Sequence, residues 1–216
     1  MTSAIDEALM RQAIAMGRTA LGLTRPNPPV GCVIARGERV FAAAATAPSG
    51  RPHAEEQAVE IAGAATMDAT CYVTLEPCGA RSSGAASCAE RLAAAGVSRV
   101  VIACEDVSPL ASGQGIERLR AAGVSVEVGV LAAEAAPLSA GFRQRLATGR
   151  PLVEAADDPA TYEGRFELAE GEDLAAALQR FGQEGYNRLW TPRRGDVAQR
   201  LAALGWLGTA PGAAMR

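Results

Sequence analysis

The chain has 216 residues, of which 49% are hydrophobic and 21% charged; this composition is typical of a globular protein and excludes disordered, collagen-like and coiled-coil chains. Its formal net charge of −3 and pI near 5.4 provide no excess of positive charge to neutralise a phosphate backbone, so we expect no nucleic-acid partner. All 21 basic residues are arginines, which excludes a Schiff-base lysine and a Walker-type phosphate loop.

Hydropathy along the chain predicts a cytoplasmic protein without a membrane partner. No apolar run approaches the roughly 18 to 20 residues of a membrane span. The first 21 residues carry dispersed charges and not the charged head and apolar block of a signal peptide. The chain has five cysteines, and this odd number favours metal ligation or buried thiols over a disulfide framework.

The first elements predicted are a helix and a hairpin. Ser3 and Asp6 form a capping-box pattern, and apolar residues follow at helical spacing, which predicts an amphipathic N-terminal helix. Residues 30–35 and 40–45 are apolar runs separated by a short polar turn, which predicts an antiparallel strand pair.

From residue 53 onward, predicted helices and strands alternate. The helices expected are 53–63, 88–95, 115–122 and 131–148, the last broken near Pro137, and the strands expected are 71–75, 99–103 and 124–128. Helices between short Val-rich strands indicate crossover connections and therefore parallel strands. We expect a three-layer α/β domain over residues 1–150.

The remaining residues, 151–216, have a different character. Residues 151–166 are acidic and expected to be irregular, followed by a helix over 172–181, a strand over 188–191 and a helix over 196–204. About sixty residues bury only a small core. We therefore expect this region to pack on the first domain or on another subunit.

One histidine, one glutamate and two cysteines point to chemistry. His53 and Glu55 open a predicted helix, Cys78 follows a predicted strand, and Cys88 opens the next helix. One imidazole and two thiolates bind zinc and leave a fourth position for water, as in catalytic zinc sites. Glu55 lies near enough to exchange protons with that water. Each piece alone also has a purely structural interpretation. His53 and Glu55 could be a solvated histidine and an exposed acid in the first turn of a helix, and the two cysteines could be small core residues.

Taken together, these residues match the His-x-Glu, Pro-Cys and Cys signature of the zinc-dependent deaminases. His53 is also the only histidine in the chain. Cys32, Cys71 and Cys104 fall in or beside predicted strands and are expected to be buried core thiols.

Longer stretches carry a closer resemblance: TRPNPPVGCVI at 24–34, CYVTLEPC at 71–78, GQGI at 113–116, and GFR and GRP within 141–151. From about residue 5 to residue 152 the sequence resembles the deaminase half of the riboflavin-biosynthesis deaminase-reductase family. The resemblance implies an α/β fold of the cytidine deaminase-like kind, three-layer α/β/α with a central mixed five-stranded sheet. A small C-terminal α/β appendage would follow it.

The resemblance also implies an activity and its cofactor. Members of that family hydrolyse the amino group of the diaminopyrimidine ribosylamino phosphate intermediate of riboflavin biosynthesis, so the partner expected is a small-molecule aminopyrimidine. His53, Cys78 and Cys88 would hold Zn²⁺, and Glu55 would be the catalytic proton shuttle. A homo-oligomer, specifically a dimer, is expected.

The substrate contacts implied are Asn27, Asp106 and Ser108, which would touch the pyrimidine or the ribose. The loop between the two cysteine ligands, residues 79–87, lacks the family's histidine. Arg81 on this loop is the expected phosphate contact, because a guanidinium forms charge-assisted hydrogen bonds with phosphate.

Residues 151–216 faintly resemble the closing segment of the family's reductase domain, without its catalytic beginning and most of its nucleotide-binding core. We therefore expect a truncated or degenerate remnant without reductase activity.

Two other hypotheses remain open. One is the same hydrolysis on another nucleobase, nucleoside or nucleotide. The other is a catalytically silent zinc-bearing scaffold, against which Glu55 counts because a structural metal does not need it.

Overall fold

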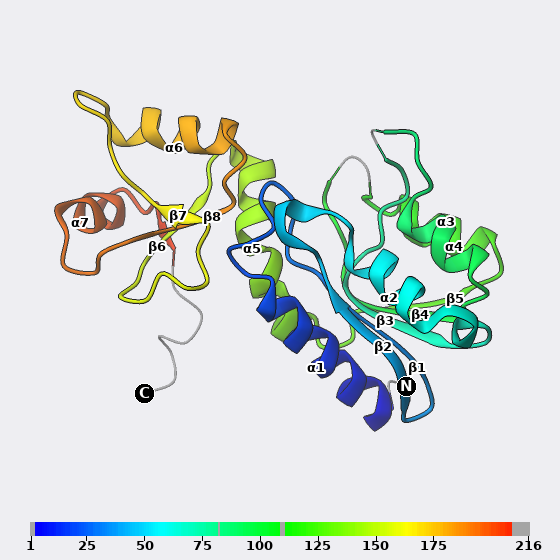
Figure 1. Cartoon of the computed structure of the whole chain (residues 1–216). Helices are drawn as coiled ribbons and strands as arrows, with labels where there is room; N and C mark the ends of the chain where they lie inside the picture. Colours follow the sequence, from blue (N-terminus) through cyan, green and yellow to red (C-terminus); the bar gives the residue numbers. More distant parts are fainter. Residues whose placement is uncertain (1–2, 82, 109–110, 209–216) are drawn as a thin grey trace.

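The protein forms two lobes connected through a long helix (Figure 1). A computed structural model describes residues 3–81, 83–108 and 111–208. The helices are α1 (Ala4–Thr19), α2 (Ala54–Ala62), α3 (Cys88–Ala94), α4 (Gln114–Ala121), α5 (Ala132–Thr148), α6 (Leu174–Gln183) and α7 (Asp196–Ala203), with short 3-10 turns at Pro48–Gly50 and Gly63–Thr66. The strands are β1 (Gly31–Arg36), β2 (Arg39–Ala45), β3 (Thr70–Leu75), β4 (Arg99–Cys104), β5 (Ser125–Val128), β6 (Leu152–Ala155), β7 (Gly164–Arg165), β8 (Arg188–Thr191) and β9 (Leu207–Gly208).

The N-terminal lobe, α1 to α5, is built on a mixed five-stranded sheet with the order β2-β1-β3-β4-β5. Strand β1 pairs antiparallel with β2 and β3, whereas β3, β4 and β5 run parallel. Helices α1 and α5 cover one face and α2, α3 and α4 the other (Figure 1). The predicted three-layer α/β/α fold with a mixed sheet is therefore confirmed.

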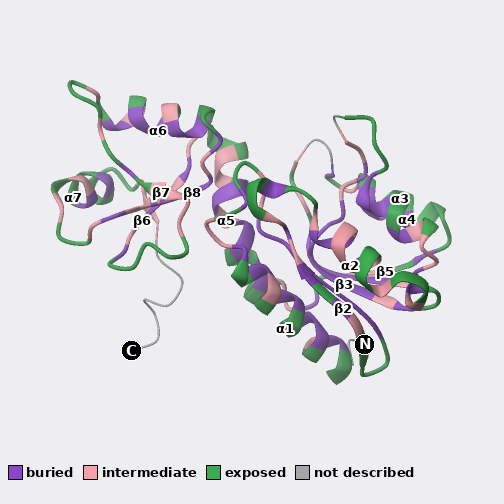
Figure 2. Cartoon of the chain, viewed as in Figure 1, coloured by how far each residue is buried: buried purple, intermediate pink, exposed green. Residues whose placement is uncertain are grey.

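The central strands are buried along almost their whole length (Figure 2). Their β-branched residues suit a sheet that is covered on both faces. Helix α1 is attached to this sheet by the buried carboxylate of Asp6, which accepts hydrogen bonds from Arg99 Nη1 at 2.7 Å and from the Tyr72 hydroxyl at 2.9 Å. The Arg99 hydrogen bond holds the pKa of Asp6 well below its usual value. The capping box predicted for Ser3 and Asp6 is present at the start of α1.

The break expected near Pro137 was wrong, because α5 continues through this residue. A proline removes the hydrogen bond that its N–H would donate to the carbonyl four residues earlier, here that of Ala133. Both residues are exposed, so water can satisfy the freed carbonyl. Further along the helix, Leu138 and Phe142 are buried, and this tertiary packing sustains the helix.

The C-terminal lobe, residues 151–208, has its own sheet and core. Its strands lie in the order β7-β8-β6-β9, and all of the pairs are parallel. The core is apolar: Val153, Phe166, Leu174, Ala177, Leu178, Phe181, Leu189 and Leu201. The predicted helices near 172–181 and 196–204 and the strand at 188–191 are confirmed.

The expectation that residues 151–166 are irregular was wrong, since β6 and β7 lie there. These strands have two to four residues, and their pairing with β8 supplies hydrogen bonds that no local pattern shows. No helix among the described residues is both long and apolar enough to cross a membrane.

Candidate active site

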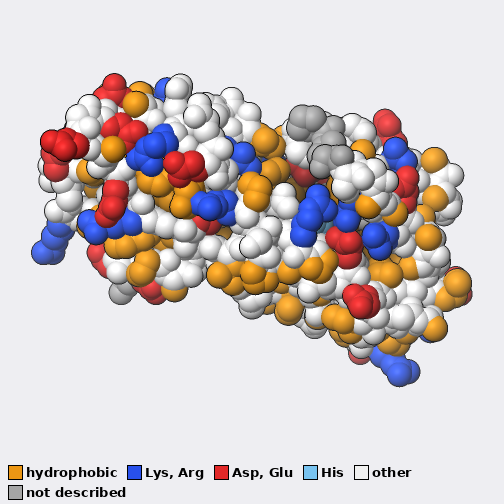
Figure 3. Space-filling view, turned by 45° about the horizontal axis from the view of Figure 1, so that its top comes forward, with side chains coloured by type: hydrophobic (Ala, Val, Ile, Leu, Met, Phe, Trp, Pro, Cys, Tyr) orange, Lys and Arg blue, Asp and Glu red, His pale blue; other side chains and the backbone are white. Residues whose placement is uncertain are grey.

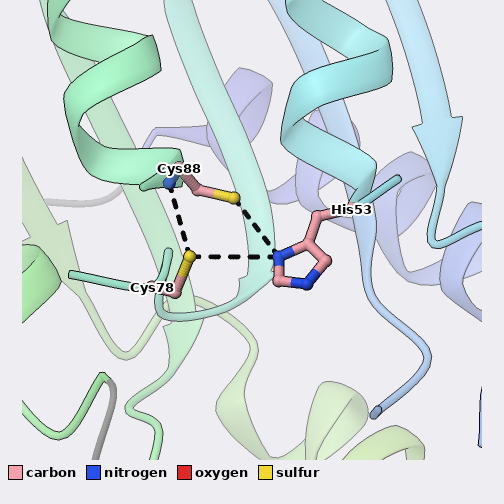
Figure 4. Close-up of side chains that lie close together, drawn as sticks. All are labelled: His53, Cys78 and Cys88. Carbon is pink, nitrogen blue, oxygen red and sulfur yellow. Dashed lines mark hydrogen bonds between the residues drawn. The ribbon is translucent and has the colours of Figure 1, made fainter. Parts of the chain in front are cut away.

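Three side chains from separate segments meet at one point (Figure 4). His53 precedes α2, Cys78 lies in the loop after β3, and Cys88 is the first residue of α3. Their ligand atoms lie within 4.8 Å of one another. The Nδ1 atom of His53 is 3.9 Å from Cys78 Sγ and 3.4 Å from Cys88 Sγ.

This geometry fits a tetrahedral zinc ion. Bonds of about 2.0 to 2.3 Å to nitrogen and sulfur place the ligand atoms of such an ion about 3.5 to 3.8 Å apart, close to the two separations observed between Nδ1 and Sγ. The donor set of one imidazole and two thiols is also one that zinc prefers. The residues present therefore fit the ion, with three protein ligands.

The start of α3 stabilises negative charge on Cys78. The backbone N–H of Cys88 donates to Cys78 Sγ at 3.3 Å, as expected where the unpaired N–H groups of a helix terminus meet a thiolate. The Cys88 thiol, together with this N–H and the His53 ring, lowers the pKa of Cys78 to about 4. Ser87 caps the same helix by accepting from the N–H of Glu90 at 3.3 Å, which fixes the direction of its first turn.

Glu56 connects the segment that carries His53 with the loop between Cys78 and Cys88. Its carboxylate accepts from the backbone N–H of His53 at 2.9 Å and pairs with Arg81 Nη2 at 2.6 Å. Burial raises the pKa of Glu56, but the hydrogen bonds from Arg81 and the His53 N–H, together with the charges of Arg81 and His53, lower it to about 2. Arg81 Nη2 also lies 3.6 Å from Cys88 Sγ. Glu56 thus holds the helix that carries the histidine against the loop that connects the two cysteines.

Glu55 lies beside the cluster, with its residue 3% exposed. Burial raises the pKa of its carboxyl group, because a low-dielectric environment disfavours the charged form. It sits in the first turn of α2, two residues after His53.

One cavity of about 430 Å³ brings the predicted residues together. Its wall includes seven of the eight predicted site residues: His53, Glu55, Cys78, Asn27, Arg81, Asp106 and Ser108. The eighth, Cys88, is fully buried next to His53 and Cys78. Cys32, Cys71 and Cys104 are free and buried, as expected, and are not members of the cluster.

Glu76 has a structural role that was not predicted, although it lies within the stretch CYVTLEPC. Glu76 is 3% exposed, and its Oε1 accepts from the N–H groups of Gly115 at 3.1 Å and Ile116 at 3.2 Å. Its Oε2 accepts from the N–H groups of Asp106 at 3.3 Å and Gly113 at 3.1 Å. The carboxylate therefore caps α4 and anchors the loop that carries Asp106. An acidic residue directly after a buried strand was the available signal.

Two arginines of the cavity wall were also missed. Arg51 is exposed at the wall and has no ion pair among the described residues. Arg145 reaches the wall from α5, almost a hundred residues after the histidine motif. No local sequence pattern indicates that an arginine so far from the histidine motif lies on the cavity wall.

The comparisons with known proteins agree with this geometry. Residues 3–104 match the family model of the cytidine and deoxycytidylate deaminase zinc-binding region. This region contains the whole cluster of His53, Cys78 and Cys88, so the zinc site lies in a region that the family uses to bind zinc.

Longer similarity extends into the C-terminal lobe. The riboflavin biosynthesis protein RibD of Escherichia coli is 38% identical over 167 residues, which are 77% of this chain and 45% of that protein. A solved structure of Acinetobacter baumannii RibD has a TM-score of 0.64 at 40% identity and covers 78% of this chain and 47% of that one. A deaminase-reductase structure from Thermotoga maritima has a TM-score of 0.65 at 31% identity and covers 81% and 49%. The chain spans about half the length of the relatives it matches.

Proposed function

We propose that the cavity catalyses hydrolytic removal of an amino group from an aminopyrimidine, with the diaminopyrimidine ribosylamino phosphate of riboflavin biosynthesis as substrate. The observation that carries the proposal is Glu55, a buried carboxylate on the wall of a cavity that also exposes two members of the metal cluster. The relative from Thermotoga maritima is a diaminohydroxyphosphoribosylaminopyrimidine deaminase as well as a reductase, and this supports the substrate proposed.

The roles follow from the contacts. His53, Cys78 and Cys88 would hold zinc, which when bound supplies a Lewis acid that activates water. Glu55 accepts a proton from the attacking water and delivers it to the leaving amine, so that ammonia and a ring carbonyl are formed. A raised pKa favours both halves of this transfer near neutral pH.

The rest of the wall would hold the substrate. Asn27, Asp106 and Ser108 lie on it together, and we propose that they bond the pyrimidine and the ribose. The Asp106 carboxylate accepts from the Ser108 N–H at 2.9 Å, which fixes the orientation of one acceptor. Burial raises the pKa of Asp106.

The phosphate of the substrate would meet arginines. The side chain of Arg81 is 6% exposed, and both of its terminal nitrogens are paired with Glu56. Its Nε is buried without a hydrogen-bond partner, so this N–H is a donor that Glu56 does not engage. Arg51 and Arg145 lie on the same wall and supply further positive charge.

The engagement of Arg81 by Glu56 favours a second candidate, deamination of an unphosphorylated base or nucleoside. A panel of aminopyrimidines with and without the phosphate, assayed for ammonia release, distinguishes the two. Preference for the phosphorylated compound supports the first candidate, and equal turnover supports the second.

Glu55→Gln tests the chemistry itself. This variant keeps the size and shape of the side chain but loses the base, so turnover should fall by at least about 10²-fold, with unchanged zinc content. The matched control is Glu60→Gln, an exposed carboxylate on the same helix, which should turn over substrate at the wild-type rate. Wild-type turnover by Glu55→Gln would instead show that Glu55 is not the proton shuttle.

Four further predictions accompany this function. We assign residues 151–216 to a reductase-like remnant that follows a deaminase domain over 1–150, and NADPH titration should show no binding. Five free cysteines fit a reducing compartment, so cytoplasmic location stays a prediction. Basic and acidic side chains are mixed over both lobes on the face in Figure 3, which favours a small-molecule partner over nucleic acid. A homodimer stays a prediction, to be checked by analytical ultracentrifugation.

A further inference from the structure

The cavity has one wall whose position depends on contacts outside the N-terminal lobe. The pocket turn, residues 24–29, connects the segment after α1 to β1, and its Pro26, Asn27 and Pro28 line the cavity. Within its own lobe the turn is held by the Asn27 N–H, which donates to Thr24 O at 2.9 Å, and by Asn27 Nδ2, which donates to Gly50 O at 2.9 Å. The carbonyl of Pro26 faces the other lobe.

Asn187, directly before β8, bonds this carbonyl. Its Nδ2 lies 3.2 Å from Pro26 O and 3.4 Å from Asn27 O. Its Oδ1 accepts from Arg145 Nε at 2.8 Å, and Arg145 Nη2 donates to the same Pro26 carbonyl at 2.9 Å. Asn187 is 3% exposed, so water does not replace these bonds freely.

Asn187 is itself held firmly in the C-terminal lobe. Its Nδ2 also donates to Glu163 Oε1 at 3.1 Å, and the Arg188 N–H donates to Glu163 Oε2 at 3.1 Å. The carbonyl of Asn187 accepts from the Leu152 N–H at 2.8 Å. The Asn187 side chain is therefore held by Glu163, directly before β7, and its backbone carbonyl by β6.

Close packing accompanies these hydrogen bonds. Gly185 has φ +84°, and a Cβ there would lie 3.0 Å from Pro26 Cβ. The guanidinium of Arg25 stacks 3.9 Å from the centre of the Tyr186 ring. Both contacts join the pocket turn to the segment just before Asn187.

We propose that the C-terminal lobe positions the pocket turn for substrate and that Asn187 is the positioning residue. The residues that line the cavity all lie between Pro26 and Leu146, so this lobe acts through the turn and does not touch the substrate. The proposal concerns the site of the proposed deaminase, and its kinetic consequence rests on that function. Its structural consequence does not.

The test uses the full zinc-loaded chain and the variant Asn187→Ala. Hydrogen exchange of the Asn27 amide should accelerate by about 10-fold, since the turn opens locally more often when its hydrogen bonds to Asn187 are lost and only the bonds within the N-terminal lobe remain. With the phosphorylated diaminopyrimidine, KM should rise about 10-fold while kcat stays within about twofold, because Glu55 and the metal cluster are untouched. Zinc content should stay at the wild-type value.

Two further variants separate positioning from general destabilisation. Glu154→Gln weakens a buried ion pair with Arg188 in the same lobe and should leave Asn27 exchange and KM unchanged. Arg25→Ala removes an exposed side chain that stacks on Tyr186 and should accelerate Asn27 exchange by a smaller factor without unfolding either lobe.

Unchanged Asn27 exchange in Asn187→Ala, or equal acceleration in Glu154→Gln, would overturn the proposal. If the wild type deaminates no aminopyrimidine, the proposed function fails, and the exchange measurements alone then decide whether the lobe positions the turn. A fall in kcat with unchanged KM would show that Asn187 supports the chemistry and does not position substrate.

Discussion

The four hydrogen bonds to Glu76 yield a quantitative prediction. In Glu76→Gln one carboxylate oxygen becomes an NH₂ group that faces two backbone N–H groups and accepts from neither. Hydrogen bonds to charged groups contribute about 1.5 to 3 kcal/mol each. Losing two of the four bonds gives about 3 to 6 kcal/mol, and the lower end applies because the loop can relax toward water.

The lobes differ in their spectroscopic signals, which makes the assay specific. Both tryptophans, Trp190 and Trp206, lie in the C-terminal lobe, so their fluorescence follows that lobe, while far-UV circular dichroism follows both. In urea unfolding, Glu76→Gln should lower the free energy of unfolding by about 3 kcal/mol when followed by circular dichroism. The decrease should be smaller when unfolding is followed by tryptophan fluorescence. The matched control, Glu134→Gln, removes a carboxylate 45% exposed in an ion pair and should change stability by under about 0.5 kcal/mol.

A loss below about 1 kcal/mol in Glu76→Gln would refute this reasoning, since that is the contribution of one neutral hydrogen bond. Equal shifts of the two transitions would also count against it, because Glu76 would then act on both lobes together. The variant should also raise KM, since Asp106 and the loop after it lose their anchor.

Three other predictions concern metal, pH and phosphate. Cys88→Ser should lower zinc below one ion per chain by elemental analysis, while Cys104→Ser retains it, because the Cys104 thiol lies outside the cluster. The depressed pKa of Asp6 means that its ion pair with Arg99 stabilises the fold above the ordinary carboxyl pKa of about 3.9 and is lost as pH falls toward its folded value. The free energy of unfolding should therefore fall between pH 5 and pH 2 more in the wild type than in Asp6→Asn, as measured by urea titration; equal slopes would contradict this. Arg81→Ala should raise KM more for a phosphorylated than for an unphosphorylated substrate, by about 10-fold for one charge-assisted bond, and equal effects would show that Arg81 only supports the loop through Glu56.

The sequence was informative about the metal cluster because few residue types can bind zinc. His53, Cys78 and Cys88 are polar or reactive side chains at the starts of helices and after a strand, and the apolar runs of the neighbouring helices and strands can be recognised in the sequence. The long elements of the N-terminal lobe were predicted for the same reason. Pro137 misled the prediction because the exposure of the freed carbonyl is a tertiary property.

The surroundings of the cluster could not be predicted in the same way. Glu56 pairs with Arg81 across 25 residues, and Arg145 bonds Pro26 across 119 residues. Nothing in the local sequence distinguishes these charges from solvated surface residues. The short strands β6, β7 and β9 escaped prediction because their hydrogen bonds are all with distant segments.

The sheet topology explains where the cavity forms. Strand β1 is antiparallel to β2 and β3, with Gly31 paired to Ala45, so the beginning of β1 lies beside the ends of both neighbours. The segments after β2, β3 and β4 therefore lie together at the carboxyl ends of these strands, which is where ligands bind in α/β folds. His53 lies in the segment after β2, and Cys78 and Cys88 lie in the segment after β3. The pocket turn, by contrast, directly precedes β1 and also contacts the C-terminal lobe. Asn187 of the C-terminal lobe bonds the turn at that point.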